Sequence, residues 1–429
     1  MSYEAIVVVL SDVRPHPNAD RLKLAVCQGH QVVVGLNVVE GMTGIFFPED
    51  GKLSVEYCET NGLYPIYDAS GAKVGGGFFD PKNSRVRAQA FRGEKSYGYF
   101  APIESVAYTG VDISTLIPGV KFSELNGHNI CEKYYTKATL SAMNSGNKLR
   151  RSNAMFHKHV DTLRFKYEAD STLKVGGVAY ITEKLHGTSA RVGLVLETVN
   201  LPDPWFYRFK RKKARTSRTK SNWTFTVGTR NLILTDPLTQ GYYNDESFRF
   251  RSVESLRSKL HKGEIIYSEL VGFVSDGRPI MSDQDTSTLK DLKQTFGDVM
   301  RYTYGTNVDE CKQFVYRITN VNVDGVEYEL SWQQVKQRCK ELDLVPVPDL
   351  CYPILVETTE DVEVVKQTVL DLTSGPSTLD QRHIREGVVV RFEDFNGKTS
   401  FLKNKSWEFG VLEGYLKNNE EYVDLEETS

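Results

Sequence analysis

One lysine, Lys184, stands where a strand-like apolar run ends and a glycine turn begins. Residues 177–181 form that run, Gly187 lies in the turn, and a second strand-like run covers residues 191–196. Lysine usually avoids the end of a buried strand, because its ammonium group loses hydration there. Lost hydration favours the neutral amine, which is a nucleophile. The pattern predicts a sheet that presents a reactive lysine, although an exposed hairpin lysine also fits so short a stretch.

The length, net charge and composition of the chain exclude several classes of protein. Its 429 residues are enough for about two or three domains. The net charge of −3 means that any nucleic-acid surface is local, because the whole protein is not a polycation. Six scattered cysteines without a CxxC pair argue against zinc and disulfide frameworks, so we expect a reducing, cytoplasmic location. No apolar run approaches about 18 residues, and the start lacks a signal-peptide layout, so we expect no membrane span.

Short strands separated by Gly and Pro turns fill residues 1–110 and predict a small β-barrel. The strands expected first are residues 5–10, 22–27 and 31–36. Weak patterning over residues 111–147 predicts a connector that is helical over 130–143. Helical periodicity recurs over residues 330–342 and 358–372, where helices are expected to cover a sheet.

Two groups of basic residues are candidates for nucleic-acid contact. In the first, cationic and aromatic side chains could supply phosphate contacts and stacking faces; they are Arg85, Arg87, Arg92, Lys95, Tyr97 and Tyr99. A solvated strand face with ordinary core tyrosines fits them equally. The second is the basic run within residues 208–220, which is either a solvated loop or a contact with a nucleic-acid backbone.

Two acids and two lysines in the second half suit phosphate chemistry. Glu269 lies in an apolar run and needs a partner when buried, such as a ribose hydroxyl, a hydrated metal or a salt bridge. Glu386 opens an apolar strand and suits water-mediated metal binding. Lys403 and Lys405 share one strand face and repel each other unless an anion such as a triphosphate lies between them. The alternative for this pair is an edge strand blunted by lysine.

Residues 183–188, Glu-Lys-Leu-His-Gly-Thr, resemble motif I of the covalent nucleotidyltransferases, which comprise DNA ligases, RNA ligases and mRNA capping enzymes. His186 stands where aspartate is usual, and that form is similar to the RNA-repair ligases. Further runs resemble motifs III, IIIa, IV and V in order; they are residues 263–272, 313–318, 385–391 and 400–406. Residues 16–22 look like the opening of tRNA-binding OB domains. A barrel placed first, with the chain ending 23 residues after Ser406, resembles the Deinococcus-type and Naegleria-type RNA ligases.

This resemblance implies an α+β fold. An OB-type β-barrel, possibly nucleic-acid-binding, is expected over residues 1–110, and the connector follows over 111–147. A ligase-type nucleotidyltransferase domain of antiparallel sheets flanked by helices is expected over 148–412. Residues 413–429 are then an acidic tail, and the protein is expected to be a monomer.

The resemblance also implies an ATP-dependent RNA ligase that uses Mg²⁺ or Mn²⁺. Lys184 would attack the α-phosphate of ATP and form a lysyl-AMP intermediate, with Lys403 and Lys405 acting in catalysis. AMP would pass to a 5′-phosphate, and a 3′-hydroxyl would displace it. RNA is the expected partner, including a nicked duplex with an RNA 3′-OH end. The alternatives are a DNA ligase, a capping guanylyltransferase, or a non-catalytic RNA- or tRNA-binding protein.

The remaining roles also come from the resemblance. Glu183 and Tyr316 would hold the adenine, with Phe314 as the alternative aromatic, since Arg317 stands where the family has aspartate. Arg230 and Glu269 would hold the ribose, with Arg215 and Arg218 as rivals of Arg230. His186 would orient phosphate or metal waters. The expected metal contacts are Glu269 and Glu386, and the expected nucleotide contacts are Glu183, Lys184, His186, Arg230, Glu269, Tyr316, Glu386, Lys403 and Lys405.

Overall fold

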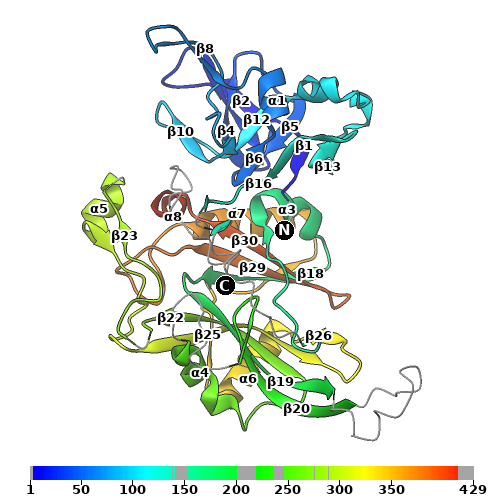
Figure 1. The fold of residues 1–429 in the computed structure, drawn as a ribbon, viewed down its shortest axis with the longest axis vertical. Helices are drawn as coiled ribbons and strands as arrows, with labels where there is room; N and C mark the ends of the chain where they lie inside the picture. Colours follow the sequence, from blue (N-terminus) through cyan, green and yellow to red (C-terminus); the bar gives the residue numbers. More distant parts are fainter. Residues whose placement is uncertain are drawn as a thin grey trace, which may run out of the picture. The chain divides into compact units, whose positions relative to one another are not determined.

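A computed structural model of the chain describes residues 3–137, 139–140, 153–200, 219–235, 246–274, 276–287 and 289–413. These residues fall into two compact units (Figure 1). The first extends to Leu140, and the second comprises the described residues from 153 to Leu412. Both units combine antiparallel sheets with helices, so the mixed α and β content expected from the sequence is confirmed.

The first unit is built from several small sheets. A four-stranded antiparallel sheet has the order β12 (Tyr99–Pro102), β5 (Thr43–Phe47), β1 (Ala5–Val9) and β13 (Lys121–Phe122). A three-stranded meander joins β2 (Ser11–Pro15), β3 (Leu22–Cys27) and β4 (His30–Gly35), and a third sheet joins β16 (Cys131–Lys133), β6 (Gly51–Leu53) and β9 (Arg85–Val86). The three strands expected first are present as β1, β3 and β4. Within the described residues these sheets do not join into one closed barrel.

The chain between residues 121 and 133 belongs to the first unit, where the sequence analysis expected a connector. Phe122 in β13 pairs with Ala5 of β1, and Cys131 in β16 pairs with Leu53 of β6. Phe122, Ile130 and Cys131 are buried in the core of this unit. Strands of two or three residues carry too little periodicity to be recognised in a sequence. Their apolar side chains pack because distant strands supply the other half of the sheet.

The second unit contains two larger sheets (Figure 1). The first has five strands in the order β17 (Leu163–Arg164), β30 (Thr399–Lys405), β29 (Gly387–Asp394), β18 (Gly177–Lys184) and β28 (Ile354–Val356). Two helices, α3 (Phe165–Thr172) and α7 (Thr359–Thr373), pack on one face through apolar residues that include Ala179 and Ile181 of β18. α7 confirms the helix expected over 358–372, and a capping box formed by Thr358 and Asp361 begins it.

The second sheet of this unit has seven strands. Its order is β21 (Ile233–Leu234), β20 (Thr219–Gly228), β19 (Thr188–Asn200), β22 (Glu264–Gly272), β25 (Cys311–Val321) and β26 (Glu327–Glu329), with β27 (Val345–Pro346) parallel to β25. The helices α4 (Ser247–Val253) and α6 (Trp332–Leu342) belong to the same part of the unit. α6 confirms the helix expected over 330–342 and begins at a capping box formed by Ser331 and Gln334.

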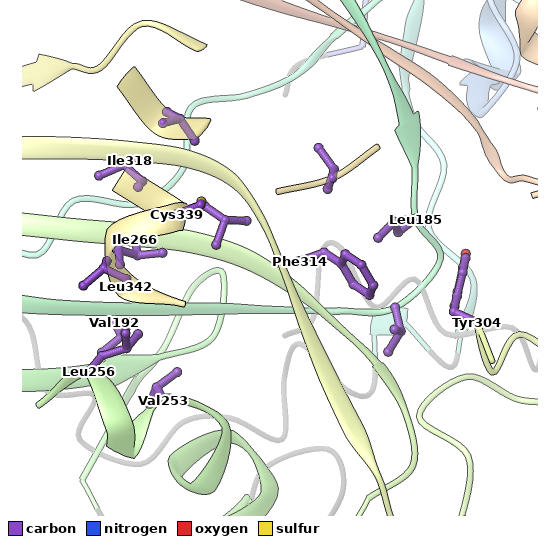
Figure 2. Packing of buried hydrophobic residues seen from close by; sticks show 14 of the residues in the cluster. Leu185, Val192, Val253, Leu256, Ile266, Tyr304, Phe314, Ile318, Cys339 and Leu342 are labelled. Carbon is purple, nitrogen blue, oxygen red and sulfur yellow. The ribbon is translucent and has the colours of Figure 1, made fainter. Parts of the chain in front are cut away.

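One apolar core connects the two sheets (Figure 2). Leu185, which directly follows β18, belongs to the same buried cluster as Val192, Ile266 and Ile318 of the seven-stranded sheet. Phe314 is also a member and is only 5% exposed. Removing such side chains from water is the main favourable contribution to folding. Because Phe314 packs in this core, it is not placed to stack on a ligand, which leaves Tyr316 as the aromatic candidate.

A buried ionic network also ties the sheets together. Glu329, at the end of β26, contacts Arg317 of β25 at 2.7 Å and Arg391 of β29 at 3.3 Å. Both arginine side chains are only 3% exposed. Burial raises the pKa of Glu329 although both arginines act to lower it. Arg317 occupies the position where related motifs have aspartate, and here its charge is matched by glutamates from β26.

We expect Glu329→Ala to be among the most destabilising substitutions in this unit. It would leave Arg317 with Glu327 and Arg391 with Glu393 as their other carboxylate partners, and each guanidinium group would lose a charged contact worth about 1.5–3 kcal/mol. The free energy of unfolding in urea measures the effect. Glu254→Ala is the matched control, because it breaks an exposed ion pair with Arg257 and should change stability little. Equal stability of the two variants would contradict a structural role for the network.

Candidate active site

Lys184 is the last residue of β18, at the point where the chain leaves one sheet and enters the other. β18 ends there, and β19 of the seven-stranded sheet begins at Thr188. The turn between them lies against β22, because a Cβ on Gly187 would come within 2.4 Å of the carbonyl oxygen of Leu270. Glycine is therefore required for close packing of the turn. Lys184 therefore lies where the two sheets of this unit meet.

The strand register brings Lys405 beside Lys184. Lys184 pairs with Gly387 of β29, and Gly387 pairs in turn with Lys405 of β30. A Cβ on Gly387 would lie 2.0 Å from the carbonyl oxygen of Asn404, so only glycine permits this approach of the strands. Lys403 lies two residues before Lys405 in the same strand and pairs with Val389. Alternation along the strand places both lysines on one face.

The carboxylate of Glu386 lies between the two lysines. Its Oε1 is 2.8 Å from Nζ of Lys184 and 2.9 Å from Nζ of Lys405. The Glu386 side chain is 2% exposed, and those of Lys184 and Lys405 are 15% and 24% exposed. Burial alone would raise the pKa of Glu386, but the two ammonium groups hold that pKa well below its ordinary value. The site is a buried carboxylate with a cation on either side.

This arrangement alters the expected activation of the nucleophile. The sequence analysis attributed a neutral Lys184 to lost hydration at the end of a buried strand. In the structure the carboxylate of Glu386 lies against the same amine, and an opposite charge at this distance favours the ammonium form. The carboxylate of Glu386 therefore opposes the loss of the Lys184 proton that attack on a phosphate requires.

His186 lies in the turn that follows β18. Its Nδ1 is 3.7 Å from Oε2 of Glu386, and its side chain is 7% exposed. The rings of Tyr302 and Phe409 pack edge-on against it, with centroids 4.9 and 4.8 Å away. The backbone N–H of His186 donates to the hydroxyl of Tyr304 at 2.6 Å. His186 therefore faces Glu386 from a tightly packed aromatic environment.

A second group of candidate residues gathers on the seven-stranded sheet. Ser189 and Glu269 are register partners on β19 and β22, and the serine hydroxyl is 3.5 Å from Oε2 of Glu269. Tyr316 lies at a register shift between β25 and β22, where Tyr267 pairs with Arg317 but Ser268 pairs with Val315. A bulge of this kind re-aims a side chain. Burial raises the pKa of Tyr316 to about 12, and the charge of Glu269 acts in the same direction.

Arg230 lies two residues after the end of β20. Its Nη2 is 3.5 Å from Oδ1 of Asp161, and its side chain is 17% exposed. The charge of Arg230 acts to lower the pKa of Tyr316, against the effect of burial. The rivals Arg215 and Arg218 lie outside the described residues, as does most of the basic run at 208–220.

Glu183 occupies the face of β18 opposite to Lys184, because successive strand residues point to opposite sides. It is 1% exposed, and its Oε2 accepts hydrogen bonds from the N–H and the hydroxyl of Thr378, at 2.9 and 2.5 Å. Its Oε1 is buried without a hydrogen-bond partner in the part of the chain that the structure describes. This placement favours a contact with the loop of Thr378, and the expected contact with adenine stays a prediction.

Two buried arginines support the site, and no sequence motif identified them. Arg249 of α4 is 1% exposed and donates to the hydroxyl of Thr188 at 2.7 Å and to the carbonyl of Ser189 at 2.8 Å. Arg191 donates to the carbonyls of Thr229 and Phe156, at 2.7 and 2.9 Å. Both guanidinium groups hold backbone next to candidate ligand residues. Arg191 opens the apolar run of residues 191–196, and a charged residue in that position is the one sequence signal that could have marked it.

In the first unit, the expected nucleic-acid residues separate into buried and exposed ones. Arg85 is 8% exposed and pairs with Asp50 at 3.5 Å, and Tyr99 stacks on Phe47 within the core. Arg92 and Lys95 are exposed on the hairpin of β10 (Gln89–Phe91) and β11 (Glu94–Ser96). Arg85 and Tyr99 therefore fit the alternative of ordinary structural residues. Arg92 and Lys95 leave an exposed basic edge on the hairpin.

Three further features bear on the expected classes of site. None of the helices in the described ranges is long and apolar enough to cross a membrane. Among the same residues, no group of three or more His, Cys, Asp or Glu side chains could hold a metal ion. All six cysteines are free thiols.

Comparisons with known proteins bear on the family and the fold of the chain. The model of the family described as RNA ligase matches residues 177–405. No curated protein matches the chain. Naegleria gruberi RNA ligase with PPi is 16% identical, with a TM-score of 0.57 over 95% of this chain and 97% of that one. A lysine-to-alanine mutant of that ligase with ATP and Mn is 17% identical, with a TM-score of 0.57 over 94% and 96%. At these identities the likeness shows the fold.

Proposed function

The chain belongs to the RNA ligase family, whose model matches more than half of it, and we propose that it joins RNA ends with ATP through a lysyl-AMP intermediate on Lys184. The observation that carries this proposal is the contact of one buried carboxylate with the amines of Lys184 and Lys405. A lysine at a strand end, with a second cation 2.9 Å from the same carboxylate oxygen, can attack a phosphate and stabilise the charge that develops.

The residues present fit a purine nucleoside triphosphate. Lys184 on β18, with Lys403 and Lys405 on β30, supplies positive charge for the phosphates from the two strands that flank β29. In this proposal Glu269 and Arg230 hold the ribose, and Tyr316, on the strand paired with that of Glu269, stacks on the base. Ser189, beside Glu269, offers a further hydroxyl. Solved structures of the Naegleria gruberi ligase with ATP and Mn, and with AMP and Mn, support this choice of cofactor.

A divalent ion, Mg²⁺ or Mn²⁺, fits these residues as an ion whose ligands are mainly phosphate oxygens and water. Glu386 is the nearest carboxylate to the lysines, and both of its oxygens already have cationic or histidine neighbours. The described residues offer no cage of three acidic or histidine ligands. When bound, such an ion offsets phosphate charge and polarises the α-phosphate. Glu386 and Glu269 are the residues that would reach its water ligands.

The first step forms a bond between Nζ of Lys184 and the α-phosphorus of ATP, and it breaks the bond to pyrophosphate. The amine gives up its proton before or during the attack. Lys405 and Lys403 stabilise the charge that builds on the phosphate oxygens. Glu386 holds Lys184 at the strand end, so the amine is positioned before the nucleotide arrives.

The second and third steps take place at the same site. A 5′-phosphate oxygen of RNA attacks the phosphorus of lysyl-AMP, the P–N bond breaks, and the amine of Lys184 regains a proton. The 3′-hydroxyl of a second end then attacks the 5′-phosphorus, a phosphodiester bond forms, and AMP leaves. Lys184 takes no covalent part in this last step.

The first unit supports substrate binding in this proposal. We assign it as an OB-type nucleic-acid-binding unit, with the hairpin that carries Arg92 and Lys95 as the basic edge. The proposed substrate is a nicked duplex with an RNA 3′-OH end, sealed by a cytoplasmic monomer.

The proposal is tested with ATP labelled at the α-phosphate and with a panel of nicked duplexes. We expect a covalent protein–AMP adduct on a denaturing gel, released by pyrophosphate. We expect sealing of nicks with a ribose 3′-OH end in preference to all-DNA nicks. Preference for GTP would instead indicate a capping enzyme, and sealing of DNA alone would indicate a DNA ligase. RNA binding without any adduct would overturn the proposal.

A further inference from the structure

Tyr304 is a buried tyrosine outside all the nucleotidyltransferase-like motifs, and it binds the turn that follows Lys184. Its hydroxyl accepts the backbone N–H of His186 at 2.6 Å, and the residue is 2% exposed. Its backbone has a φ of +52°, a region that bulky residues rarely adopt. Such a conformation persists only where its surroundings hold it, and it is concentrated at functional sites.

The loop of residues 374–386 holds Tyr304 in this conformation. The N–H of Gly305, the next residue, donates to Oδ2 of Asp380 at 2.9 Å. The ring of His383 packs edge-on against the ring of Tyr304, with centroids 4.5 Å apart. His383 is itself completely buried. The loop therefore packs against Tyr304, and Tyr304 binds the turn that follows Lys184.

The same loop also binds the residue on the other side of Lys184. Thr378 donates its N–H and its hydroxyl to Oε2 of Glu183, at 2.9 and 2.5 Å. The loop ends at Glu386, whose carboxylate contacts the amine of Lys184. The side chain before the nucleophile, the backbone after it and the carboxylate that holds its amine are thus all connected to one loop.

We propose that Tyr304 and Thr378 are positioning residues for the transfer of AMP to Lys184. They hold the chain on both sides of the nucleophile, so that its amine stays in line with the α-phosphate. The inference rests on the proposed function and deepens it, because it assigns the alignment of the first step to residues outside the motifs. A displacement of about 1 Å at a reacting atom is enough to slow a reaction about 100-fold.

Tyr304→Phe tests this role, because it removes only the hydroxyl that accepts the His186 N–H. We expect the rate of adduct formation at saturating ATP to fall about 10-fold to 100-fold, with little change in KM for ATP. We expect sealing of RNA that already carries a 5′-AMP to stay near the wild-type rate, because that step needs no attack by Lys184. A purely structural role would slow both reactions together.

Two further variants keep the test decisive if Tyr304→Phe does not fold. Thr378→Val removes the hydroxyl bound to Glu183 and should also slow adduct formation selectively, and Thr378→Ser should restore it. Tyr57→Phe is the matched control, since it removes an equally buried hydroxyl, bonded to Ser105 at 2.9 Å, from the other unit. It should leave adduct formation unchanged.

The outcomes separate the inference from the proposed function. Wild-type rates of adduct formation in folded Tyr304→Phe or Thr378→Val protein would overturn the inference. Equal losses in adduct formation and in sealing of the pre-adenylylated RNA would overturn it as well. If the wild-type protein forms no adduct at all, the proposed function fails instead.

Discussion

Replacement of Lys184 by alanine is expected to abolish the protein–AMP adduct completely. The P–N bond forms on Nζ of this residue, and the other amine at the same carboxylate, that of Lys405, extends from a different strand. Because Lys405 reaches Glu386 from β30 and not from the junction of the two sheets, it cannot take the place of the missing nucleophile. The expected loss exceeds that of any other substitution in the protein.

The measurement is incubation with ATP labelled at the α-phosphate, followed by a denaturing gel. Lys184→Arg should also form no adduct, although it keeps the positive charge beside Glu386, so a charge effect and loss of the nucleophile are distinguished. Lys174→Ala is the control, because Lys174 is an exposed lysine of the same unit. Sealing of RNA that already carries a 5′-AMP should survive in Lys184→Ala. Label on the Lys184→Ala protein at the wild-type level would refute the assignment.

The parts of this site that could be predicted are those that lie in a strand or directly beside one. Lys184, Glu269, Glu386 and Lys405 each stand in or next to an apolar run, and a charged residue in such a run is conspicuous. Their order along the chain then matched a known family. The two-residue period of a strand was enough to predict that Lys403 and Lys405 share one face.

The parts that could not be predicted depend on contacts between distant segments. Tyr304 and Thr378 look like ordinary loop residues in the sequence, because their partners His186 and Glu183 are more than a hundred residues away. The sequence also suggested repulsion between lysines, since it showed Lys403 and Lys405 together. It did not show that Glu386 would lie between Lys184 and Lys405, because that contact depends on the register of three strands.

The sequence also did not reveal how far the first unit extends along the chain. Residues 121–133 carry strands of two or three residues, and such strands are stable only when longer partners such as β1 and β6 are already in place. Single-sequence periodicity cannot detect them, because a period needs several repeats to be recognised. A boundary inferred from weak patterning was therefore drawn within a compact unit, about thirty residues before its described end at Leu140.

Glu386→Gln is expected to have the second-largest effect, and to affect rate and pH dependence in different ways. The amide keeps the shape of the side chain but removes its negative charge. Two ammonium groups that now lie within 2.9 Å of one carboxylate oxygen would then repel each other without compensation. Lys184 would lose its fixed position, and adduct formation should slow about 100-fold to 1,000-fold, as when other preorganised charges are removed from active sites.

The direction of the pH shift follows from the same charges. In the wild-type protein the carboxylate of Glu386 favours the protonated form of Lys184, so adduct formation should rise with pH as the amine loses its proton. Without the carboxylate, and with Lys405 still present, the amine loses its proton at a lower pH. The midpoint of the rate–pH curve should therefore move to lower pH in Glu386→Gln, while the maximal rate falls. A lower rate with an unchanged or higher midpoint would mean that Glu386 acts on the bound nucleotide alone, and that the carboxylate does not control the nucleophile.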